Sequence, residues 1–214
     1  IVGDPLDMIA SGPAYPDRST AADAHAVVDK YGLQLSPDML ALLDRPTPAA
    51  LDNVETHITG SVRELCSAAA AECRALGYET HILTASLGCE AREAGSFLAS
   101  VAQYHADTEK PLAFIAGGET VVHITGTGKG GRNQELALSA ARGIAGMDNA
   151  LIFSVGSDGT DGPTDAAGGL ADGGTCAALE AKGISIDRVL ADNDAYHALQ
   201  QADGLIITGP TGTN

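Results

Sequence analysis

The sequence predicts an α/β protein in which helices flank a mixed, largely parallel β-sheet. Segments with a helical period alternate with short strand-like segments from Thr59 onward, an order typical of a sheet covered by helices. The apolar residues, 44% of the chain, are mostly aliphatic, and only 4% of the residues are aromatic. The 26 glycines gather in short runs, which indicates shaped loops at the ends of these elements.

Residues 1–18 are predicted to be a loop, because Pro5, Pro13 and Pro16 break any regular period. A helix is expected from about Thr20 to Tyr31, and a second helix begins after Ser36. These helices have hardly a core of their own. Residues 1–58 are therefore expected to pack on a part of the protein that is absent from this chain or on the remainder of the chain.

Residues 59–214 show the alternating pattern most clearly. A helix over 61–76 ends at Gly77, and Ser86 is a candidate cap for the next helix. Two strands are expected on either side of a Gly-Gly pair, at 111–116 and 120–124. The remaining expected elements are a strand at 80–84, a helix at 90–104, a helix at 133–144, a strand at 150–155, helices near 176–182 and 194–201, and a strand at 205–208.

The composition excludes several kinds of partner. A net charge of −16 repels nucleic acid and anionic membranes, and the sequence shows no targeting signal or apolar run of membrane-spanning length. The four cysteines have neither zinc-site spacing nor the density of a disulfide scaffold. A cytoplasmic protein with reduced thiols is expected, and both ends of the chain look cut.

The loop that precedes the helix at 133–144 has the composition of an anion site. Gly128, Gly130 and Gly131 allow backbone amides to converge at the positive end of the helix dipole. Lys129 and Arg132 supply positive charge that is scarce elsewhere in this acidic chain. An ordinary strand-to-helix turn, the alternative interpretation, needs about one glycine and no cations.

Two named nucleotide motifs compete for this loop. It is not a Walker A loop, because its lysine is followed by glycine. It does match G-x-G-x-x-G at Gly126, Gly128 and Gly131, which is the case for an NAD(P)H-dependent reductase. However, the next acidic residue after a strand is Asp158, later than the usual spacing of about 20 residues. Two cations also suit a polyphosphate better.

Three aspartates follow the expected strand at 150–155. Asp158, Asp161 and Asp165 lie on a Gly-rich turn where ligands of open α/β sheets bind, so they are predicted to converge on Mg²⁺, with Asp158 the first choice. A solvated acidic turn, or a helix cap at Asp165, is the alternative for any single aspartate.

Two further loops are candidates for binding. Gly117, Gly118 and Glu119 place a carboxylate after two glycines, where it would orient the lysine, the arginine or a metal. The end of the chain, which contains Thr211, has the small hydroxyl residues of a ligand loop. An ordinary hairpin and an ordinary turn are the respective alternatives.

Five runs of sequence together resemble the class II glycerate 2-kinases with a MOFRL domain, a family also labelled hydroxypyruvate reductase. The runs occur in the order typical of that family and extend over nearly the whole chain. They are residues 3–13, 117–122, 128–138, 157–168 and 208–214. One departure is Cys89, which stands where a glycine is expected.

The resemblance implies an enzyme that transfers phosphate from ATP to D-glycerate with Mg²⁺, giving 2-phosphoglycerate, in a cleft between two α/β domains. It assigns Arg132 to the transferred phosphate or the substrate carboxylate. Residues 1–58 would be the remnant of an N-terminal glycerate kinase domain, and residues 59–214 a MOFRL-like domain. The rest of the N-terminal domain, with a catalytic lysine in a Gly-Lys loop, is an expected partner before Ile1, and a homodimer is left open.

The resulting predictions name three catalytic residues, Arg132, Lys129 and Asp158. The predicted nucleotide-binding residues are Gly117, Gly118, Glu119, Gly128, Gly130, Gly131, Asn133 and Thr211, and the predicted metal ligands are Asp158, Asp161 and Asp165. Two alternatives to the kinase stay open. One is the hydroxypyruvate reductase, and the other is a non-catalytic module that binds nucleotide or substrate weakly.

Overall fold

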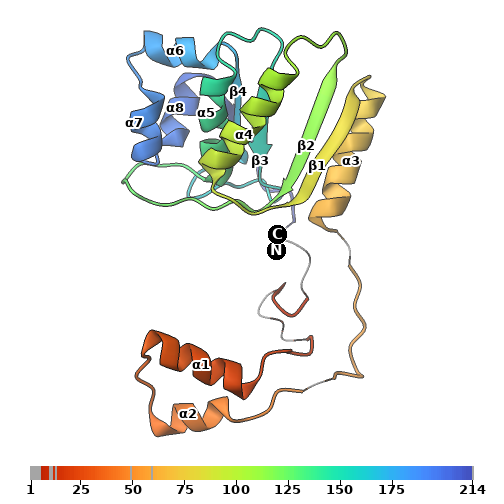
Figure 1. Ribbon diagram of the computed structural model, residues 1–214, viewed down its shortest axis with the longest axis vertical. Coiled ribbons are helices and arrows are strands. Elements are labelled where there is room, and N and C mark those ends of the chain that lie inside the picture. Colours follow the sequence, from red (N-terminus) through yellow and green to blue (C-terminus); the bar gives the residue numbers. More distant parts are fainter. Residues whose placement is uncertain (1–5, 10–11, 13, 49, 59, 214) are drawn as a thin grey trace. The chain divides into compact units, whose positions relative to one another are not determined.

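The computed structural model describes residues 6–9, 12, 14–48, 50–58 and 60–213 (Figure 1). Pro5 and Pro13, which were expected to break the period of the first segment, lie outside the described residues. Contacts divide the chain into two compact units, residues 1–65 and 66–214. This division falls slightly beyond the domain boundary expected after residue 58, and the assignment of each part to a domain stays a prediction.

The first unit contains two short helices, α1 (Ala21–Tyr31) and α2 (Pro37–Leu43), which contact each other. Thr20 and Asp23 form a reciprocal capping box at the start of α1. Gly32 ends α1 in the left-handed conformation, and the Ser36 side chain caps α2. Every residue of these two helices is described, and none is buried. Both helices, and their lack of a core, are confirmed.

The second unit is a mixed α/β structure, as predicted. Strands β1 (Glu79–Leu87) and β2 (Leu112–Gly118) form a parallel pair. Strands β3 (Leu151–Val155), β4 (Gly168–Asp172) and β5 (Leu205–Ile206) form an antiparallel sheet in that order. The helices are α3 (Val62–Ala75), α4 (Ala91–Tyr104), α5 (Arg132–Gly143), α6 (Thr175–Ala181), α7 (Ile186–Ala191) and α8 (Ala195–Gln201).

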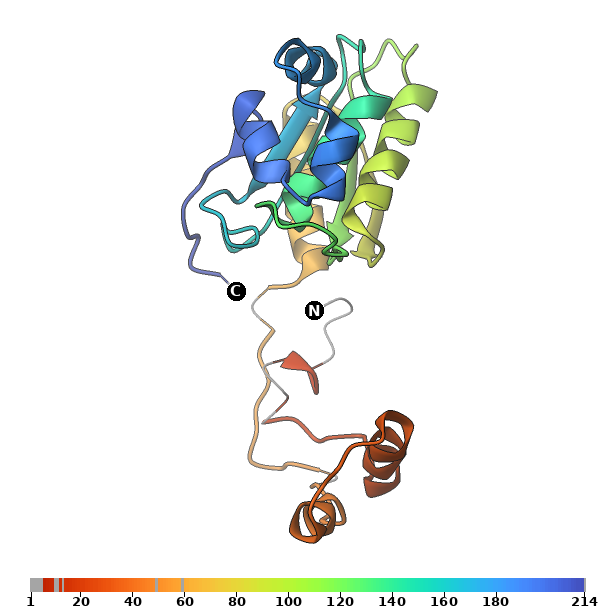
Figure 2. The ribbon, with the colours of Figure 1, turned by 90° about the vertical axis from the view of Figure 1, so that its left-hand side faces the viewer.

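Helix α5 is the centre of the second unit, packed against α4, β3, β4 and α8 (Figures 1 and 2). It contributes to two hydrophobic clusters, one around Leu138, Leu179 and Leu199 and the other around Ile144 and α4. A side chain at Gly95 of α4 would lie 2.2 Å from the carbonyl oxygen of Leu136, so glycine permits the close crossing of α4 and α5. Because α5 is buried on most sides, its first residues have a well-defined position.

The strand expected at 120–124 is not formed. Instead β2 continues through Gly117 and Gly118, and the chain then follows an irregular path to α5, with one isolated bridge at Val121. Gly118 lies so close to β1 that a side chain would be 2.2 Å from the Leu87 carbonyl oxygen. The apolar residues in the expected strand have no further neighbouring strand, and Ile124 is 82% exposed. Strand propensity alone was misleading here.

Other elements also differ from the expectation. Ser86 belongs to β1, and Glu90 occupies the N-cap position of α4 without a side-chain capping hydrogen bond. The sequence analysis did not expect β4, whose glycines are poor strand formers. A side chain at Gly169 would lie 2.5 Å from Leu199 Cδ1, so the small residues of β4 allow the helices to pack closely. The short helix α7 was also not expected. No helix in the described ranges is long and apolar enough to cross a membrane.

Candidate functional site

The candidate site lies at one edge of the second unit. Strands β2 and β3 point toward this edge, and the loops that follow them gather there with the segment after β5 (Figures 1 and 2). The carboxyl ends of strands in α/β proteins are the usual place for ligand-binding loops. The structure therefore brings together three of the loops that the sequence analysis selected, at 117–119, 157–165 and 208–213.

Arg132 is the first residue of α5, and its guanidinium lies between two of these loops. Its Nη1 donates a hydrogen bond to Glu119 Oε1 at 2.6 Å and lies 3.4 Å from the Thr120 carbonyl oxygen. The hydrogen bond from Arg132 lowers the pKa of Glu119. Both side chains remain 47% exposed. The arginine is thus oriented by a carboxylate and still accessible to a ligand.

Asp158 lies within electrostatic range of Arg132. Its carboxylate accepts hydrogen bonds from the Thr160 amide at 2.9 Å and the Thr160 hydroxyl at 3.0 Å. These bonds lower the pKa of Asp158, and the positive charge of Arg132 acts in the same direction. The predicted association of the arginine with an aspartate near residue 160 stays a prediction.

Thr211 lies against the same aspartate loop. Its amide donates to the Asp158 carbonyl oxygen at 3.1 Å, and its hydroxyl donates to the Ser157 carbonyl oxygen at 2.6 Å. Gly159, with a φ of 84°, approaches Gly209 so closely that a side chain would lie 2.1 Å from the Gly209 carbonyl oxygen. The hydrogen bonds of Thr211 and the close approach of Gly159 to Gly209 therefore hold the segment after β5 at the edge of the site.

Asp161 has a structural task that the sequence analysis did not foresee. Its carboxylate accepts hydrogen bonds from the backbone amides of Asn133 at 3.1 Å and Gln134 at 2.9 Å, and from both of their side chains. It is only 3% exposed. Since Gly131 at the N-cap position has no side chain to cap α5, Asp161 caps this helix from a distant loop.

The predicted group of three metal-binding aspartates is not assembled. Within the described ranges, no three His, Cys, Asp or Glu side chains gather as a potential metal site. Asp161 caps α5, and Asp165 Oδ1 accepts a hydrogen bond from the Tyr196 hydroxyl at 2.7 Å. Two of the three carboxylates thus hold neighbouring elements, and metal binding by the three aspartates stays a prediction. Among the described residues, Asp158, the first choice, is hydrogen-bonded within its own turn and by Thr211 in the exposed segment after β5.

The glycine-rich loop before α5 binds the protein itself rather than presenting a row of free amides. Residues 192–194, between α7 and α8, accept hydrogen bonds from five consecutive backbone amides of this loop. These amides belong to Thr125, Gly126, Thr127, Gly128 and Lys129, at distances from 2.7 to 3.0 Å. The prediction that the Gly128 amide binds phosphate is wrong, since that amide donates to the Asp192 carbonyl oxygen. The corresponding roles of Gly130 and Gly131 stay predictions.

The spacing of the glycines in this loop has a steric cause. A side chain at Gly126 would lie 2.3 Å from Asp192 Cα, and one at Gly128 would lie 2.4 Å from Asp194 Cβ. At Gly131, a side chain would lie 2.3 Å from the Asp161 carboxyl carbon. The G-x-G-x-x-G match thus reflects close contact with other parts of the chain, which weakens the dinucleotide interpretation.

Sequence reasoning missed the residues that hold this loop. Asn193, in the left-handed conformation with a φ of 56°, accepts the amides of Thr125 and Gly126 through its side-chain oxygen. Its side-chain nitrogen donates to Glu135, which is 3% exposed and pairs with Arg92 at 3.1 Å. The only local signal is an asparagine between two short helical segments, where the left-handed conformation is common.

Asn133 and Gln134 also have internal partners. The side-chain oxygen of Asn133 accepts a hydrogen bond from Ser154 at 2.6 Å, so the predicted nucleotide-binding residue connects α5 to β3. Gln134 is fully buried and donates to Asp161 and Thr164. These contacts join α5 to the aspartate loop and make that edge of the second unit one continuous network.

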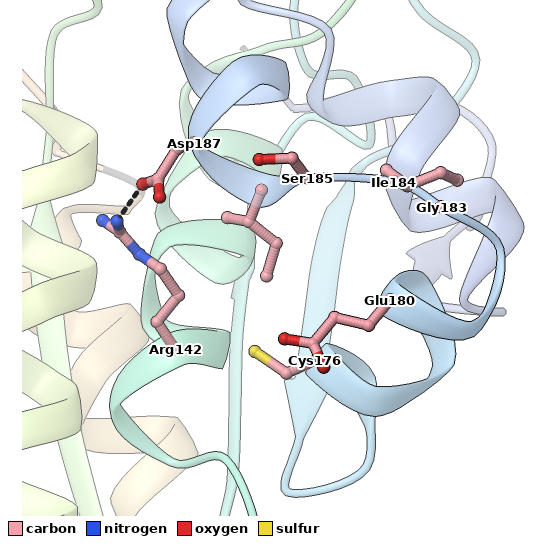
Figure 3. Close-up of a pocket in the computed structure, with 8 residues that line it drawn as sticks. Arg142, Cys176, Glu180, Gly183, Ile184, Ser185 and Asp187 are labelled. Atoms are coloured by element: carbon pink, nitrogen blue, oxygen red, sulfur yellow. Dashed lines mark hydrogen bonds and ion pairs between the residues drawn. The ribbon is translucent and has the colours of Figure 1, made fainter.

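A separate pocket of about 330 Å³ lies near the C-terminal end of α5, between α5, α6 and α7 (Figure 3). The ion pair between Arg142 and Asp187 lies at its rim. Burial raises the pKa of the Cys176 thiol, and Glu180 adds to this effect. None of the predicted site residues lines this pocket, so the pocket is separate from the candidate site.

Two family profiles match the chain. Residues 112–214 match the MOFRL family, and residues 1–44 match a domain of unknown function, DUF4147. The chain is 50% identical to a D-glycerate 2-kinase from Thermotoga maritima, over all of this chain and 52% of that relative. It is 30% identical to a glycerate kinase from Macaca fascicularis, of which it covers 68%.

A solved structure shows the same arrangement. The crystal structure of a glycerate kinase from Thermotoga maritima matches with a TM-score of 0.91 and 49% identity, over all of this chain and 53% of that one. The chain thus spans about half the length of this relative. On the evidence of sequence and structure together, it belongs to the glycerate kinase family that carries a MOFRL domain.

Proposed function

We propose that this chain is part of an enzyme that transfers the terminal phosphate of ATP to D-glycerate and forms 2-phosphoglycerate. The observation that supports this most directly is the position of Arg132, oriented by Glu119 and in range of Asp158 at the ends of β2 and β3. The relative that is 50% identical is named a D-glycerate 2-kinase. Family membership and site geometry therefore agree.

Phosphoryl transfer makes electrostatic rather than covalent demands on a protein. The enzyme must place the substrate hydroxyl in line with the phosphate and neutralise the charge that develops on the phosphate oxygens. Arg132 is suited to this second task, because its planar guanidinium can donate two parallel hydrogen bonds to a phosphate or a carboxylate. We assign it to the transferred phosphate or to the glycerate carboxylate.

The carboxylates at this edge fit a divalent cation held by few protein ligands. Mg²⁺ usually binds one or two carboxylates together with water and substrate phosphates. We assign Asp158 to this role, since hydrogen bonds from Thr160 lower its pKa. When bound, Mg²⁺ would neutralise phosphate charge, and Asp158 would be the residue that holds it.

The proposal includes the predicted partner domain with a catalytic lysine in a Gly-Lys loop. The 52% coverage of the Thermotoga maritima relative is consistent with such a domain. We also propose that ATP is the phosphate donor and that the protein is cytoplasmic. The homodimer stays a prediction. The hydroxypyruvate reductase has less support, because amides of the G-x-G-x-x-G loop are bonded to residues 192–194.

One pair of assays separates the two activities. The full-length protein is incubated with D-glycerate, ATP and Mg²⁺ while ADP release is recorded, and separately with hydroxypyruvate and NADH while NADH absorbance is recorded. We expect ADP release that requires glycerate and is abolished by EDTA, with a constant NADH signal. NADH oxidation without glycerate-dependent ADP release would overturn the kinase proposal.

A further inference from the structure

Tyr196 connects two predicted site residues that are far apart in the sequence. The Lys129 ammonium lies 4.2 Å from the centroid of the Tyr196 ring, and the Tyr196 hydroxyl donates to Asp165 at 2.7 Å. Tyr196 is itself only 9% exposed. One buried side chain from α8 therefore contacts a cation from the glycine-rich loop and a carboxylate from the aspartate loop.

The main chain of Lys129 is held in addition to its side chain. Its amide donates to Asp194 Oδ1 at 2.9 Å, and its carbonyl oxygen accepts a hydrogen bond from the Tyr196 amide at 2.9 Å. A free lysine side chain has high rotamer entropy that binding must overcome. With the backbone and the ammonium both held, part of this entropy is already lost before a ligand arrives.

The contact with the ring positions the ammonium without neutralising it. The salt bridges found among the described residues do not include Lys129, so its charge is held by a neutral aromatic face. The hydrogen bond from Tyr196 lowers the pKa of Asp165, and the charge of Lys129 acts in the same direction. The cation therefore stays available to an anionic ligand.

We propose that Tyr196 is a positioning residue whose ring holds the Lys129 ammonium ready for the phosphate groups of the nucleotide. This inference rests on the proposed kinase function. The ring supplies the position of the cation, whereas the hydroxyl holds Asp165 and the aspartate loop. Lys129 would contact the phosphates directly, and Tyr196 would act only through Lys129.

A double-mutant cycle on the full-length protein tests this division of roles. The variants are Tyr196→Leu, Lys129→Met, the double variant and Tyr196→Phe, which keeps the ring. Calorimetry measures the dissociation constant for tripolyphosphate, and steady-state assays measure KM for MgATP and kcat. We expect Tyr196→Leu to weaken tripolyphosphate binding and raise KM about two- to fivefold, with a smaller change in kcat. Tyr196→Phe, which keeps the ring, should retain more of the tripolyphosphate affinity than Tyr196→Leu.

The coupling between the two residues is the decisive result. In the Lys129→Met background, Tyr196→Leu should weaken binding no further. Equal effects in both backgrounds, or equal effects of Tyr196→Phe and Tyr196→Leu, would overturn the inference, because Tyr196 would then act through the fold. Tyr31→Leu is the matched control, since Lys30 lies 5.2 Å over the Tyr31 ring in the first unit.

Two further readouts keep the inference testable. If Tyr196→Leu does not fold, the Lys129 ε-methylene resonance should show an upfield ring-current shift in the unchanged protein and in Tyr196→Phe. A resonance at the ordinary position in both would overturn the inference. If the tripolyphosphate coupling is present but glycerate is not phosphorylated, the proposed function fails while the inference holds. If glycerate is phosphorylated but the tripolyphosphate coupling is absent, the inference fails while the proposed function holds.

Discussion

Arg132 is the residue whose replacement should affect turnover most at this edge of the second unit. Arg132→Ala is expected to lower kcat/KM for glycerate phosphorylation about 10²- to 10³-fold, the usual loss when a donor to developing charge is removed. The thermal unfolding midpoint should change little, because the side chain is 47% exposed. Coupled ADP assays and thermal unfolding of the full-length protein measure the two effects.

A matched control for Arg132 is present in the same helix. Arg142→Ala breaks an exposed ion pair with Asp187 and should leave turnover unchanged. Arg132→Lys should restore only part of the activity, since an ammonium lacks the planar guanidinium fork. Near-normal turnover of Arg132→Ala would remove this residue from the mechanism.

The hydrogen bond between Tyr196 and Asp165 should make stability depend on pH. It lowers the pKa of Asp165, so the stabilisation is present above the ordinary aspartate pKa and is lost as the pH falls through the lowered value. It raises the pKa of Tyr196, so it is also lost as the pH rises through that raised value. The stability difference between the unchanged protein and Tyr196→Phe should therefore be largest near neutrality.

Urea unfolding of the two proteins at several pH values tests this expectation. The difference in unfolding free energy should decline below about pH 4 and above about pH 10. A difference that is constant across this range would show that the hydroxyl has no charged partner in solution.

At the scale of elements, α5 depends on Asp161 from another loop. Asp161→Ala should lower the free energy of unfolding by about 1–3 kcal/mol, because it removes a helix cap and leaves buried donors unsatisfied. Chemical unfolding measures the change. Asp107→Ala, an exposed aspartate in the turn after α4, is the control and should change stability by less than about 0.5 kcal/mol. Equal effects of the two substitutions would contradict the capping role.

The loop before α5 shows how one element positions a site residue through another. The Asn193 side chain accepts hydrogen bonds from two backbone amides of this loop and donates one to Glu135. Glu135 in turn forms an ion pair with Arg92. The partly buried pair joins α4 to α5, so the loop that carries Lys129 is connected to the centre of the second unit. The glycines serve this close packing more than they serve a ligand.

At the scale of the whole molecule, the described segment at residues 50–58 of the first unit should be the first site of proteolysis. Residues 50–58 have no helix or strand, and the Glu55 side chain is 85% exposed. Cleavage by a glutamate-specific protease should therefore occur after Glu55 before it occurs after glutamates in helices. Mass spectrometry of short digests identifies the first cut. A first cut after the buried Glu135 would contradict this arrangement.

Much of the architecture was predictable because its signals are local. The helix α1 is marked by Thr20 and Gly32, and the alternation of helices and strands indicated the α/β class. The position of the aspartate loop after β3 was also predictable, since loops at strand ends have a common location, whereas the strand expected before the Arg132 loop is not formed. The glycine-rich strand β4 was not, because its residues have low strand propensity and pair only when both neighbours are present.

The sequence by itself determined the fold class and the family, and it predicted which loops would bind a ligand. Only the tertiary structure decided what each polar group in those loops does. Asp161 caps a helix 27 residues away, and the amides of the glycine-rich loop bind a turn 64 to 68 residues further along the chain. The physical reason is that a buried donor or acceptor must find a partner, and a partner distant in sequence leaves no local pattern.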